Sequence, residues 1–447
     1  MNQHVIIGEG GFGCVLSPAV KASIPGIVYD DKLSKVGTKN DIESEYKKYR
    51  LVELADKYSK YYIGKPYKSD LLYSKELASI LNKCKMFQTK PFTKSNAKQY
   101  AQLIMNYGGI TLNKFIEKLN NMLTDKTQIN YEKIQYFQTV KQSVDKLIEE
   151  ADSEDKKTQF RIALLAIDKK LVELQSDVIQ TIINNVEQML FAMRNLFVGI
   201  NAFLNTRVVH MDVKPENIIY DEDTHQMYFI DFGLMSSFSD IVKNNKNYKH
   251  SLNPNNPPEQ TYYIGFNLQI ASIETHYNDK LKYIRNHHDY LFTKKHSFNY
   301  ETVVTQYKNM LDMLPSEGKR KLMDKSLATF DIYGLGYTIF TIFNKLTVSL
   351  GQIELDVIEL CKKMMNWNVF DRITIKHVIV EFDSILMKHG LFAKYEEVQT
   401  MRTISNDRKS IKSYTKKSAP LSLPRSPESQ NRSKQRSLTK KKRHNSI

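Results

Sequence analysis

The groups best suited to chemistry lie between Val208 and Ile219, where a polar loop follows two apolar β-branched residues. This loop contains a carboxylate, Asp212, an ammonium, Lys214, and an amide, Asn217. Phosphoryl transfer needs such a set: a carboxylate that accepts the proton of a hydroxyl, a cation beside the transferred phosphate, and an oxygen ligand for a metal ion. A polar turn between strands would explain any one of these residues, but the whole set in one loop predicts a phosphoryl-transfer centre.

A second carboxylate follows at a spacing that suits the first. Asp231 ends the apolar run from Tyr228 to Ile230 and lies 19 positions after Asp212, which leaves room for one hairpin that carries both to the same mouth. A single carboxylate at the end of a strand is usually a cap or a turn residue. Beside Asp212, however, it is suited to hold a Mg²⁺ or Mn²⁺ ion that bridges the phosphates of a nucleotide.

A glycine-rich segment lies near the start of the sequence. Glycines at positions 8, 10, 11 and 13 have no Cβ, so the backbone can approach a polyphosphate closely. Dinucleotide-binding folds share this spacing but place a helix directly after the loop, whereas the residues from Cys14 to Leu16 predict a strand. The segment is therefore either a phosphate-binding loop or a plain hairpin. The residues expected to contact the nucleotide here are Ile7, Gly8, Glu9, Gly10, Gly11, Phe12, Gly13, Cys14 and Val15.

The chain around these motifs changes character along its length. Short apolar strands flank the glycines, and another, from Gln102 to Tyr107, ends at a pair of glycines. Beyond about residue 130 the apolar residues follow helical spacing. Twelve uncharged, mostly apolar residues from Ile332 to Phe343 predict a buried helix that is too short to cross a membrane. Strands first and helices afterwards predict an α+β fold with two unlike lobes.

Together these motifs resemble the eukaryotic-type protein kinase superfamily, whose signature is a glycine-rich loop, a lysine on the third strand, HRDLKxxN, DFG and APE. The similarity covers residues 7 to about 382. It implies a kinase fold with a small β-rich lobe and a large helical lobe, ATP as the phosphate donor, and protein substrates. It makes Asp212 the catalytic base, Lys214 the γ-phosphate partner, and Asn217 and Asp231 the ligands of Mg²⁺ or Mn²⁺. A lysine two positions after the base is the form seen in serine/threonine kinases.

Other positions agree with this resemblance. Pro257-Pro258-Glu259 resembles APE, and Arg372 matches the arginine that pairs with its glutamate. Asp331 resembles the buried aspartate that braces the catalytic loop from a central helix. In the first lobe, Met105 falls at the gatekeeper position, and Tyr107 falls in the hinge whose backbone binds adenine.

The lysine of the third strand and its partner on the following helix are less narrowly defined. Lys35 fits best because an apolar residue follows it within an apolar segment, and Lys32 and Lys21 are the alternatives. Its partner is Glu45 or Glu43. We favour Glu45 because the tyrosines that follow it would then pack inward.

Two features depart from the family pattern. Met211 replaces the arginine that normally contacts a phosphorylated activation loop, so we expect activity that does not depend on phosphorylation there. Two insertions interrupt the helical lobe, near residues 120–175 and at 262–327, the first a helical excursion and the second beside the expected peptide groove. The second contains His276, His287, His288 and His296. Without cysteines or acids at ligand spacing, these histidines indicate surface or packing positions rather than a metal site.

The expected domains are a kinase N-lobe at 1–107, a C-lobe at 108–398 and a disordered tail at 399–447. The tail has almost no aromatic residues, and from position 401 it carries 14 Lys and Arg against two acids, most of the net charge of +16. A weak contact with nucleic acid or another anionic surface is therefore expected only through the tail. Its serines beside cations are expected phosphorylation sites: Ser410, Ser426 and Ser437.

The cysteines bear on the compartment. They are odd in number and widely spaced, at Cys14, Cys84 and Cys361, which predicts neither a disulfide framework nor a zinc site. A reducing, cytoplasmic location follows, without a secretory signal or membrane insertion. The abundance of Lys, Asn, Ile and Tyr resembles kinases encoded by large DNA viruses, for which a virion or the nucleus is the alternative location.

Three classes of function compete. An active serine/threonine kinase is favoured because every group that the chemistry requires is present. A pseudokinase scaffold would be favoured only if Lys35 were misplaced and no other lysine reached the phosphates. A nucleic-acid-binding protein would work through its basic tail, but no aromatic residues are interleaved there for stacking on bases.

Overall fold

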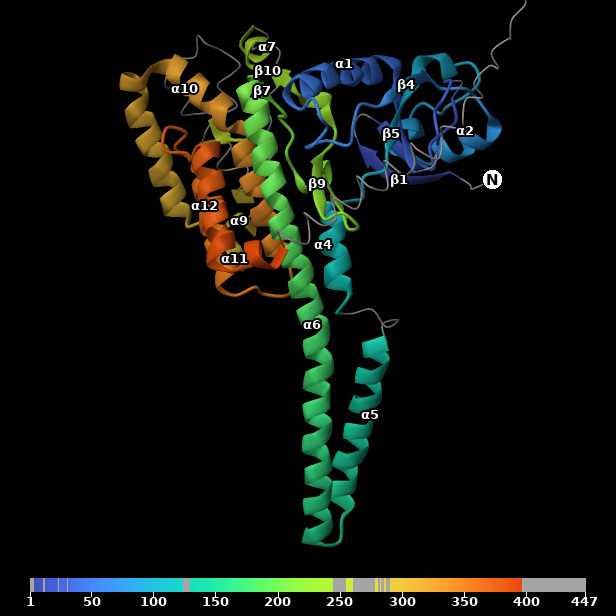
Figure 1. Ribbon diagram of the computed structural model, residues 1–447, viewed down its shortest axis with the longest axis vertical. Helices are drawn as coiled ribbons and strands as arrows, with labels where there is room; N and C mark the ends of the chain where they lie inside the picture. Colours follow the sequence, from blue (N-terminus) through green and yellow to red (C-terminus); the bar gives the residue numbers. More distant parts are fainter. Residues whose placement is uncertain are drawn as a thin grey trace, which may run out of the picture. The chain divides into compact units, whose positions relative to one another are not determined.

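The computed structural model describes residues 4–10, 13–22, 24–29, 31–123, 129–243, 255–259, 278–279, 282, 285–286 and 290–395 (Figure 1). Contacts divide the chain into residues 1–399 and 400–447, and the second unit, with the predicted basic tail, lies outside the described residues. Among the residues described, no helix has both the length and the apolar character that crossing a bilayer requires.

The first lobe is built on a five-stranded antiparallel sheet in the order β1-β2-β3-β5-β4. Its strands are β1 (Val5–Gly10), β2 (Gly13–Ser17), β3 (Lys32–Thr38), β4 (Tyr67–Asp70) and β5 (Tyr100–Asn106). In β3, Lys35 pairs with Val15 on one side and with Leu103 on the other. This central register holds the lysine backbone on two flanking strands.

One long helix, α1 (Lys39–Ala55), follows β3 directly. The Thr38 hydroxyl caps its first turn by accepting a hydrogen bond from the Asp41 amide. Its buried residues repeat every three or four positions, so one stripe faces the protein interior: Ile42, Glu45, Tyr49 and Val52. A glutamate in that stripe is unusual and points to a buried partner.

A helical cap, residues 71–99, follows β4 and precedes β5 in the sequence, and it packs against the sheet. No sequence pattern predicted it. The cap contains α2 (Lys75–Leu81), α3 (Lys85–Gln88) and η1 (Ala97–Gln99). Its apolar side chains, such as Leu81 and Phe87, share a core with Cys14, Leu16 and Val36 of the sheet. The cap therefore supports the strands that flank the glycines.

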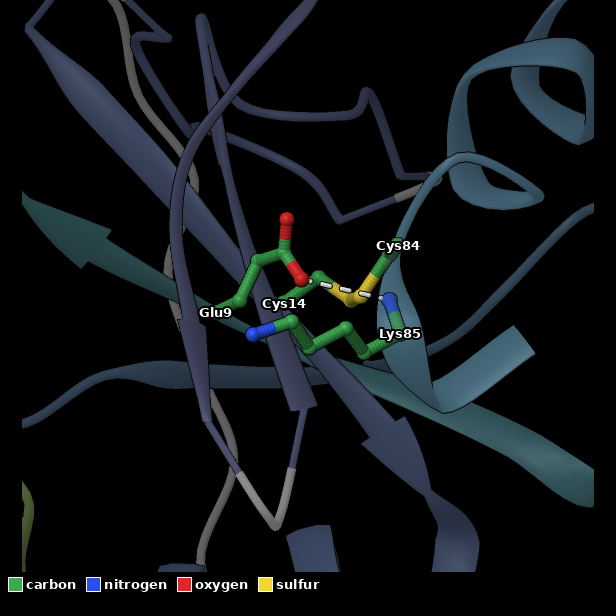
Figure 2. The surroundings of a disulfide bond; sticks show 4 residues. All are labelled: Glu9, Cys14, Cys84 and Lys85. Carbon is green, nitrogen blue, oxygen red and sulfur yellow. Dashed lines mark hydrogen bonds between the residues drawn. A yellow bond between two sulfur atoms is a disulfide. The ribbon is translucent and has the colours of Figure 1, made fainter. Parts of the chain in front are cut away.

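A disulfide bond joins the cap to β2. Cys14 and Cys84 are bonded, with their Cα atoms 6.5 Å apart (Figure 2). Cys361 is free and buried. The prediction that the cysteines form no disulfide was therefore wrong. The 70 positions between them carry no pairing signal, and only the folded cap brings the two side chains within bonding geometry. The reducing location that rested on this prediction loses that support.

The second lobe is mainly helical. Its helices are α4 (Leu112–Asn121), α5 (Ile129–Glu150), α6 (Glu154–Asn205), α7 (Phe238–Lys243), α9 (Tyr290–Thr293), α10 (Tyr300–Lys345), α11 (Gln352–Met364) and α12 (Ile375–Lys388). The predicted buried helix from Ile332 to Phe343 forms the end of α10, and its side chains lie in the main core. A sheet-based lobe followed by a helical one confirms the predicted two-lobed α+β fold.

The first predicted insertion corresponds to a helical hairpin. α5 runs antiparallel to the first part of α6 (Figure 1), and Lys141 of α5 pairs with Asp168 of α6 at 2.6 Å. The last part of α6 lies in the core of the lobe, where Met193, Leu196 and Ile200 are buried. One continuous helix thus serves both the hairpin and the core.

Much of the second predicted insertion lies outside the described residues, including His276, His287 and His288. Its later part forms α9 and the beginning of α10. His296 is buried there, and its Nε2 lies 2.5 Å from Oε1 of Glu354 in α11. This contact attaches the middle of the insertion to the helical core.

Candidate functional site

Two small sheets carry the polar loops of the site. The first contains β6 (Ile110–Thr111), β8 (Ile218–Asp221) and β9 (Gln226–Phe229), and the second contains β7 (Val208–Val209) and β10 (Ser236–Ser237). The loop with Asp212 lies between β7 and β8, and Asp231 directly follows β9. Because β8 and β9 form a hairpin in which Ile218 pairs with Phe229, the loop with Asp212 and the residue Asp231 lie at the same end of this hairpin.

The loop before β8 is braced from the central helix. Oδ2 of Asp331 accepts a hydrogen bond from the His210 amide at 2.8 Å, and Oδ1 accepts one from the Met211 amide at 3.0 Å. Asp331 is almost fully buried, and Met211 has a φ of +67°, a left-handed conformation that a non-glycine residue adopts at a cost. The paired hydrogen bonds to Asp331 hold this turn of the loop.

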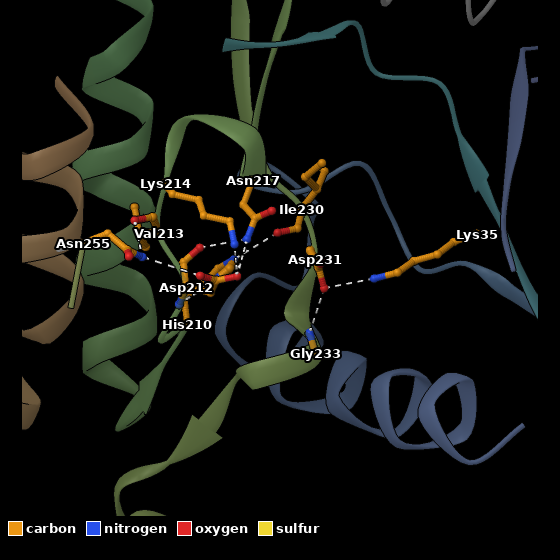
Figure 3. Close-up of polar contacts among 10 residues, drawn as sticks. All are labelled: Lys35, His210, Asp212, Val213, Lys214, Asn217, Ile230, Asp231, Gly233 and Asn255. Atoms are coloured by element: carbon orange, nitrogen blue, oxygen red, sulfur yellow. Dashed lines mark hydrogen bonds and ion pairs between the residues drawn. The ribbon is translucent and has the colours of Figure 1, made fainter. Parts of the chain in front are cut away.

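Asp212 lies at the centre of a polar cluster (Figure 3). Its Oδ2 accepts hydrogen bonds from Nζ of Lys214 and from Nδ2 of Asn217, both at 2.7 Å. The side chain of Asn255 adds a longer contact, 3.5 Å, to Oδ1. Sequence reasoning missed Asn255, because nothing in its neighbourhood links it to a loop 43 positions away. The donors fix the carboxylate while leaving its side chain 15% exposed.

Lys35 joins the two lobes. Its Nζ lies 2.7 Å from Oε2 of Glu45 in α1 and 3.0 Å from Oδ1 of Asp231. Burial lowers the pKa of Lys35, but the two carboxylates outweigh this effect and hold the pKa above its ordinary value. Burial raises the pKa of Asp231, yet Lys35 brings that pKa below its ordinary value. Both groups are therefore charged at neutral pH.

The alternatives to this pair point elsewhere. Nζ of Lys32 donates to the side chain of Asn106 at 2.6 Å, and Lys21 is exposed. Glu43 pairs with Lys68 on the solvent side of α1. The rotation of α1 thus brings Glu45, rather than Glu43, to Lys35.

A column of aromatic rings links α1 to the site. Tyr62, Tyr49, Phe232 and His210 follow one another with ring centroids 6.3, 5.3 and 5.1 Å apart. Nδ1 of His210 accepts a hydrogen bond from the Asp212 amide, so its Nε2 is the nitrogen that donates to the Ile230 carbonyl. The column packs the turn after β9 against both lobes, and no pattern in the sequence predicted it.

The glycine-rich segment forms the hairpin of β1 and β2, in which Glu9 pairs with Cys14 and Gly10 with Gly13; Gly11 and Phe12 lie outside the described residues. A Cβ at Gly10 would meet no described atom within 4 Å, which leaves its backbone open to a ligand. At Gly13, with a φ of +153°, a Cβ would lie 2.2 Å from the Val36 carbonyl oxygen. Gly13 is therefore required by packing against β3.

The neighbours of these glycines have contacts of their own. The Glu9 carboxylate accepts a hydrogen bond from the Lys85 amide of the cap at 3.2 Å, which turns its charge away from the hairpin tip (Figure 2). The Ile7 carbonyl accepts one from Nζ of Lys114 in α4. Gly8 pairs with Val15 of β2, and a Cβ at Gly8 would lie 3.7 Å from the Val15 side chain.

The predicted hinge lies at the end of β5. Met105 is partly buried and pairs with Leu33 of β3. The Tyr107 amide donates to the Asp31 carbonyl at 2.7 Å, so this amide already has a partner within the protein. A Cβ at Gly109 would lie 2.2 Å from the Tyr220 carbonyl oxygen, so the hinge needs glycine to approach β8.

The predicted pair of Glu259 and Arg372 lies deep in the helical lobe. Nη1 and Nη2 of Arg372 donate to the two carboxylate oxygens at 2.6 and 3.0 Å, and both side chains are fully buried. Ser326 donates to the same carboxylate. A buried charge pair with this bidentate geometry anchors the segment at Glu259 to the helical lobe.

Comparisons with known proteins add little to this geometry. No protein-family model matches the sequence, and no relative is found among the curated proteins. Among solved structures, the chain is similar to the kinase domain of a Toxoplasma gondii specific rhoptry antigen, with 10% identity, 88% of this chain and 82% of that chain covered, and a TM-score of 0.41.

The residues present fit a divalent metal ion. Nδ2 of Asn217 donates hydrogen bonds to Asp212. The side-chain oxygen of Asn217, Oδ1, is therefore the atom that could bind a metal ion. Asp231 uses Oδ1 for Lys35 and the Gly233 amide, so its Oδ2 is the atom directed to other partners, and the side chain is 34% exposed. Within the described parts of the chain, no group of three or more His, Cys, Asp or Glu could hold a metal by itself. An amide and a carboxylate oxygen suit Mg²⁺, with phosphates and water completing the shell.

Proposed function

We propose that this protein is an ATP-dependent serine/threonine protein kinase that requires Mg²⁺ or Mn²⁺. The observation that carries the proposal is the convergence of Asp212, Lys214, Asn217 and Asp231 at one mouth, with Lys35 bridging Asp231 and Glu45 across the lobes. A plain polar turn does not account for the contact of Lys35 with Asp231, which lies 196 positions away.

The chemistry follows from the positions of these groups. The acceptor hydroxyl binds beside Asp212, which orients it and takes its proton as the oxygen attacks the γ-phosphorus of ATP and ADP leaves. Lys214 lies beside Asp212 and balances charge on the transferred phosphoryl group, while Lys35 orients the α- and β-phosphates. Asn217 and Asp231 would hold the metal ion, which would supply positive charge to neutralise the phosphates.

Serine/threonine specificity is the finer part of the proposal. Lys214 occupies the position that is lysine in serine/threonine kinases, and its ammonium is fixed by Asp212 at 2.7 Å. The contacts of Lys35 with both carboxylates count against the pseudokinase alternative, which required that lysine to be misplaced. Binding of nucleic acid through the tail stays a prediction, since the tail lies outside the described residues.

The test is transfer of labelled phosphate. Purified protein, ATP and Mg²⁺ are incubated with a panel of proteins, and the modified residues are identified by mass spectrometry. We expect phosphoserine and phosphothreonine, loss of transfer on chelation of the metal, and loss of transfer in Asp231→Asn with the fold retained. Wild-type turnover and metal dependence in Asp231→Asn would overturn the metal assignment, and phosphotyrosine alone would overturn the specificity.

A further inference from the structure

A second lysine of α1 reaches the turn that carries Asp231. Lys48 lies three positions after Glu45, and its Nζ donates a hydrogen bond to the Gly233 carbonyl at 2.5 Å. Residues three apart on a helix share a face, so α1 contacts this turn at two points. Glu45 does so through Lys35, and Lys48 does so directly.

The turn needs such support. Asp231 has a φ of +60°, a left-handed conformation that is costly for any residue with a Cβ. Within the turn, the Gly233 amide reaches Oδ1 of Asp231 only at 3.4 Å, which is a weak bond. The hydrogen bond from the ammonium of Lys48 is short and charge-assisted, and bonds of this kind are roughly twice as strong as neutral ones. It therefore restrains the backbone two residues beyond the metal ligand.

The residue directly before Asp212 is not basic. Met211 occupies the position of the arginine that would contact a phosphate, and it is buried in an apolar cluster with Phe238 and Ile241 of α7. A phosphate placed among these side chains would gain no ion pair from residue 211. A fixed contact from α1 can instead order the turn without a phosphate.

We propose that Lys48 is a positioning residue that holds the Asp231–Gly233 turn in its metal-binding conformation without phosphorylation. This inference rests on the proposed function, because it assigns Lys48 to the metal site of the same kinase. Lys48 touches neither substrate nor metal in this role. It acts through Asp231, and it makes the position of α1 a determinant of metal affinity.

The variant that tests the proposal is Lys48→Met, which keeps an unbranched side chain and removes the ammonium. Lys47→Met is the matched control, because Lys47 lies on the same helix, is 70% exposed and has only a 3.8 Å contact with Glu43. Lys48→Arg is the conservative variant, since a guanidinium can still donate to the Gly233 carbonyl.

Two measurements do not depend on catalysis. Hydrogen–deuterium exchange of nucleotide-free protein reports the stability of residues 232–237, and Mn²⁺ titration of the ATP complex by electron paramagnetic resonance reports metal affinity. In Lys48→Met we expect faster exchange and Mn²⁺ affinity weakened about tenfold, the effect of losing one charge-assisted hydrogen bond. Metal-free ATP binding and the melting temperature should match those of Lys47→Met, and Lys48→Arg should recover most of the loss.

Other results would overturn the proposal. Equal exchange and equal Mn²⁺ affinity in Lys48→Met and Lys47→Met would leave Lys48 without a positioning role. Loss of metal-free ATP binding in Lys48→Met would instead place Lys48 against the phosphates. If the wild type bound no nucleotide, the proposed function would fail, and exchange at residues 232–237 would still decide whether Lys48 holds the turn.

Discussion

Asp212 receives donors from two sides, and this arrangement separates its role from nucleotide binding. Lys214 and Asn217 both donate to Oδ2, while the longer contact from Asn255 reaches Oδ1. These donors orient the carboxylate toward a hydroxyl, whereas the proposed contacts with the adenine and with the α- and β-phosphates lie in the other lobe. Loss of the charge should therefore impair the chemical step far more than the binding of ATP.

We predict that Asp212→Asn lowers kcat by about 10²–10⁴-fold, because an amide cannot accept the hydroxyl proton. The dissociation constant of ATP should stay within about twofold of wild type, since general-base catalysis acts on the acceptor. Steady-state kinetics and nucleotide titration measure the two quantities. Loss of ATP binding would mean that Asp212 contacts the nucleotide.

Lys35 offers a second test at the residue scale, with a control on the same strand. Lys35→Met should lower kcat/KM by about 10²-fold, because the phosphates lose the cation that aligns them. Lys32→Met removes the same charge from β3 but disrupts only a contact with the Asn106 side chain. Kinase assays of both variants decide the matter, and a larger loss in Lys32→Met would show that the register of the phosphate-binding lysine is wrong.

Among the elements, the cap governs the strands of the glycine-rich hairpin. It holds β2 through the bond between Cys14 and Cys84, holds β1 through the contact of Glu9 with the Lys85 amide, and shares its core with the sheet. A hairpin of two strands is marginally stable by itself. The cap therefore limits the conformations open to the glycine segment before any nucleotide arrives.

Removal of the cross-link should weaken this element. We expect Cys84→Ser to lower the free energy of unfolding by about 2–4 kcal/mol under oxidising conditions. Without the cross-link, the unfolded chain regains the conformational entropy that closing a loop of 70 positions had removed. Urea unfolding with and without a thiol reductant measures this change. In reductant, wild type and variant should become nearly equal, and a difference that persisted there would assign the effect to packing around Cys84.

At the scale of the whole molecule, a buried carboxylate joins the second insertion to the helical core. Glu354 of α11 accepts hydrogen bonds from Ser349 and the Leu350 amide and lies 2.5 Å from both Lys295 and His296. Burial raises the pKa of Glu354, but these donors outweigh burial and lower the pKa below its ordinary value. The ionised form is therefore the one that the folded state favours.

A lowered pKa in the folded state gives a stability that is present above the unfolded pKa, about 4.5, and is lost as the pH falls through the folded pKa. Glu354→Gln should cost about 1–3 kcal/mol at pH 7, since it removes the charge from a satisfied buried site. The loss should shrink below pH 4.5. Urea midpoints from pH 3 to 7 test this, with Glu359→Gln, 66% exposed on the same helix, as the control.

The sequence by itself determined the parts of the site that are contiguous in the chain. The loop from His210 to Asn217 and the turn at Asp231 are short contiguous segments, so their residue types and spacing predict a local geometry. The order of the elements, strands first and helices afterwards, likewise determined the two-lobed fold, because the spacing of apolar residues reflects which faces are buried.

Only the tertiary structure decided the contacts between segments far apart in sequence. The choice of Glu45 over Glu43 depends on the rotation of α1, and the contact of Lys48 with Gly233 spans 185 positions. The bond between Cys14 and Cys84 depends on a cap that no motif indicates. Such pairings come from the packing of whole elements, and a local pattern of residue types does not encode how two distant elements meet.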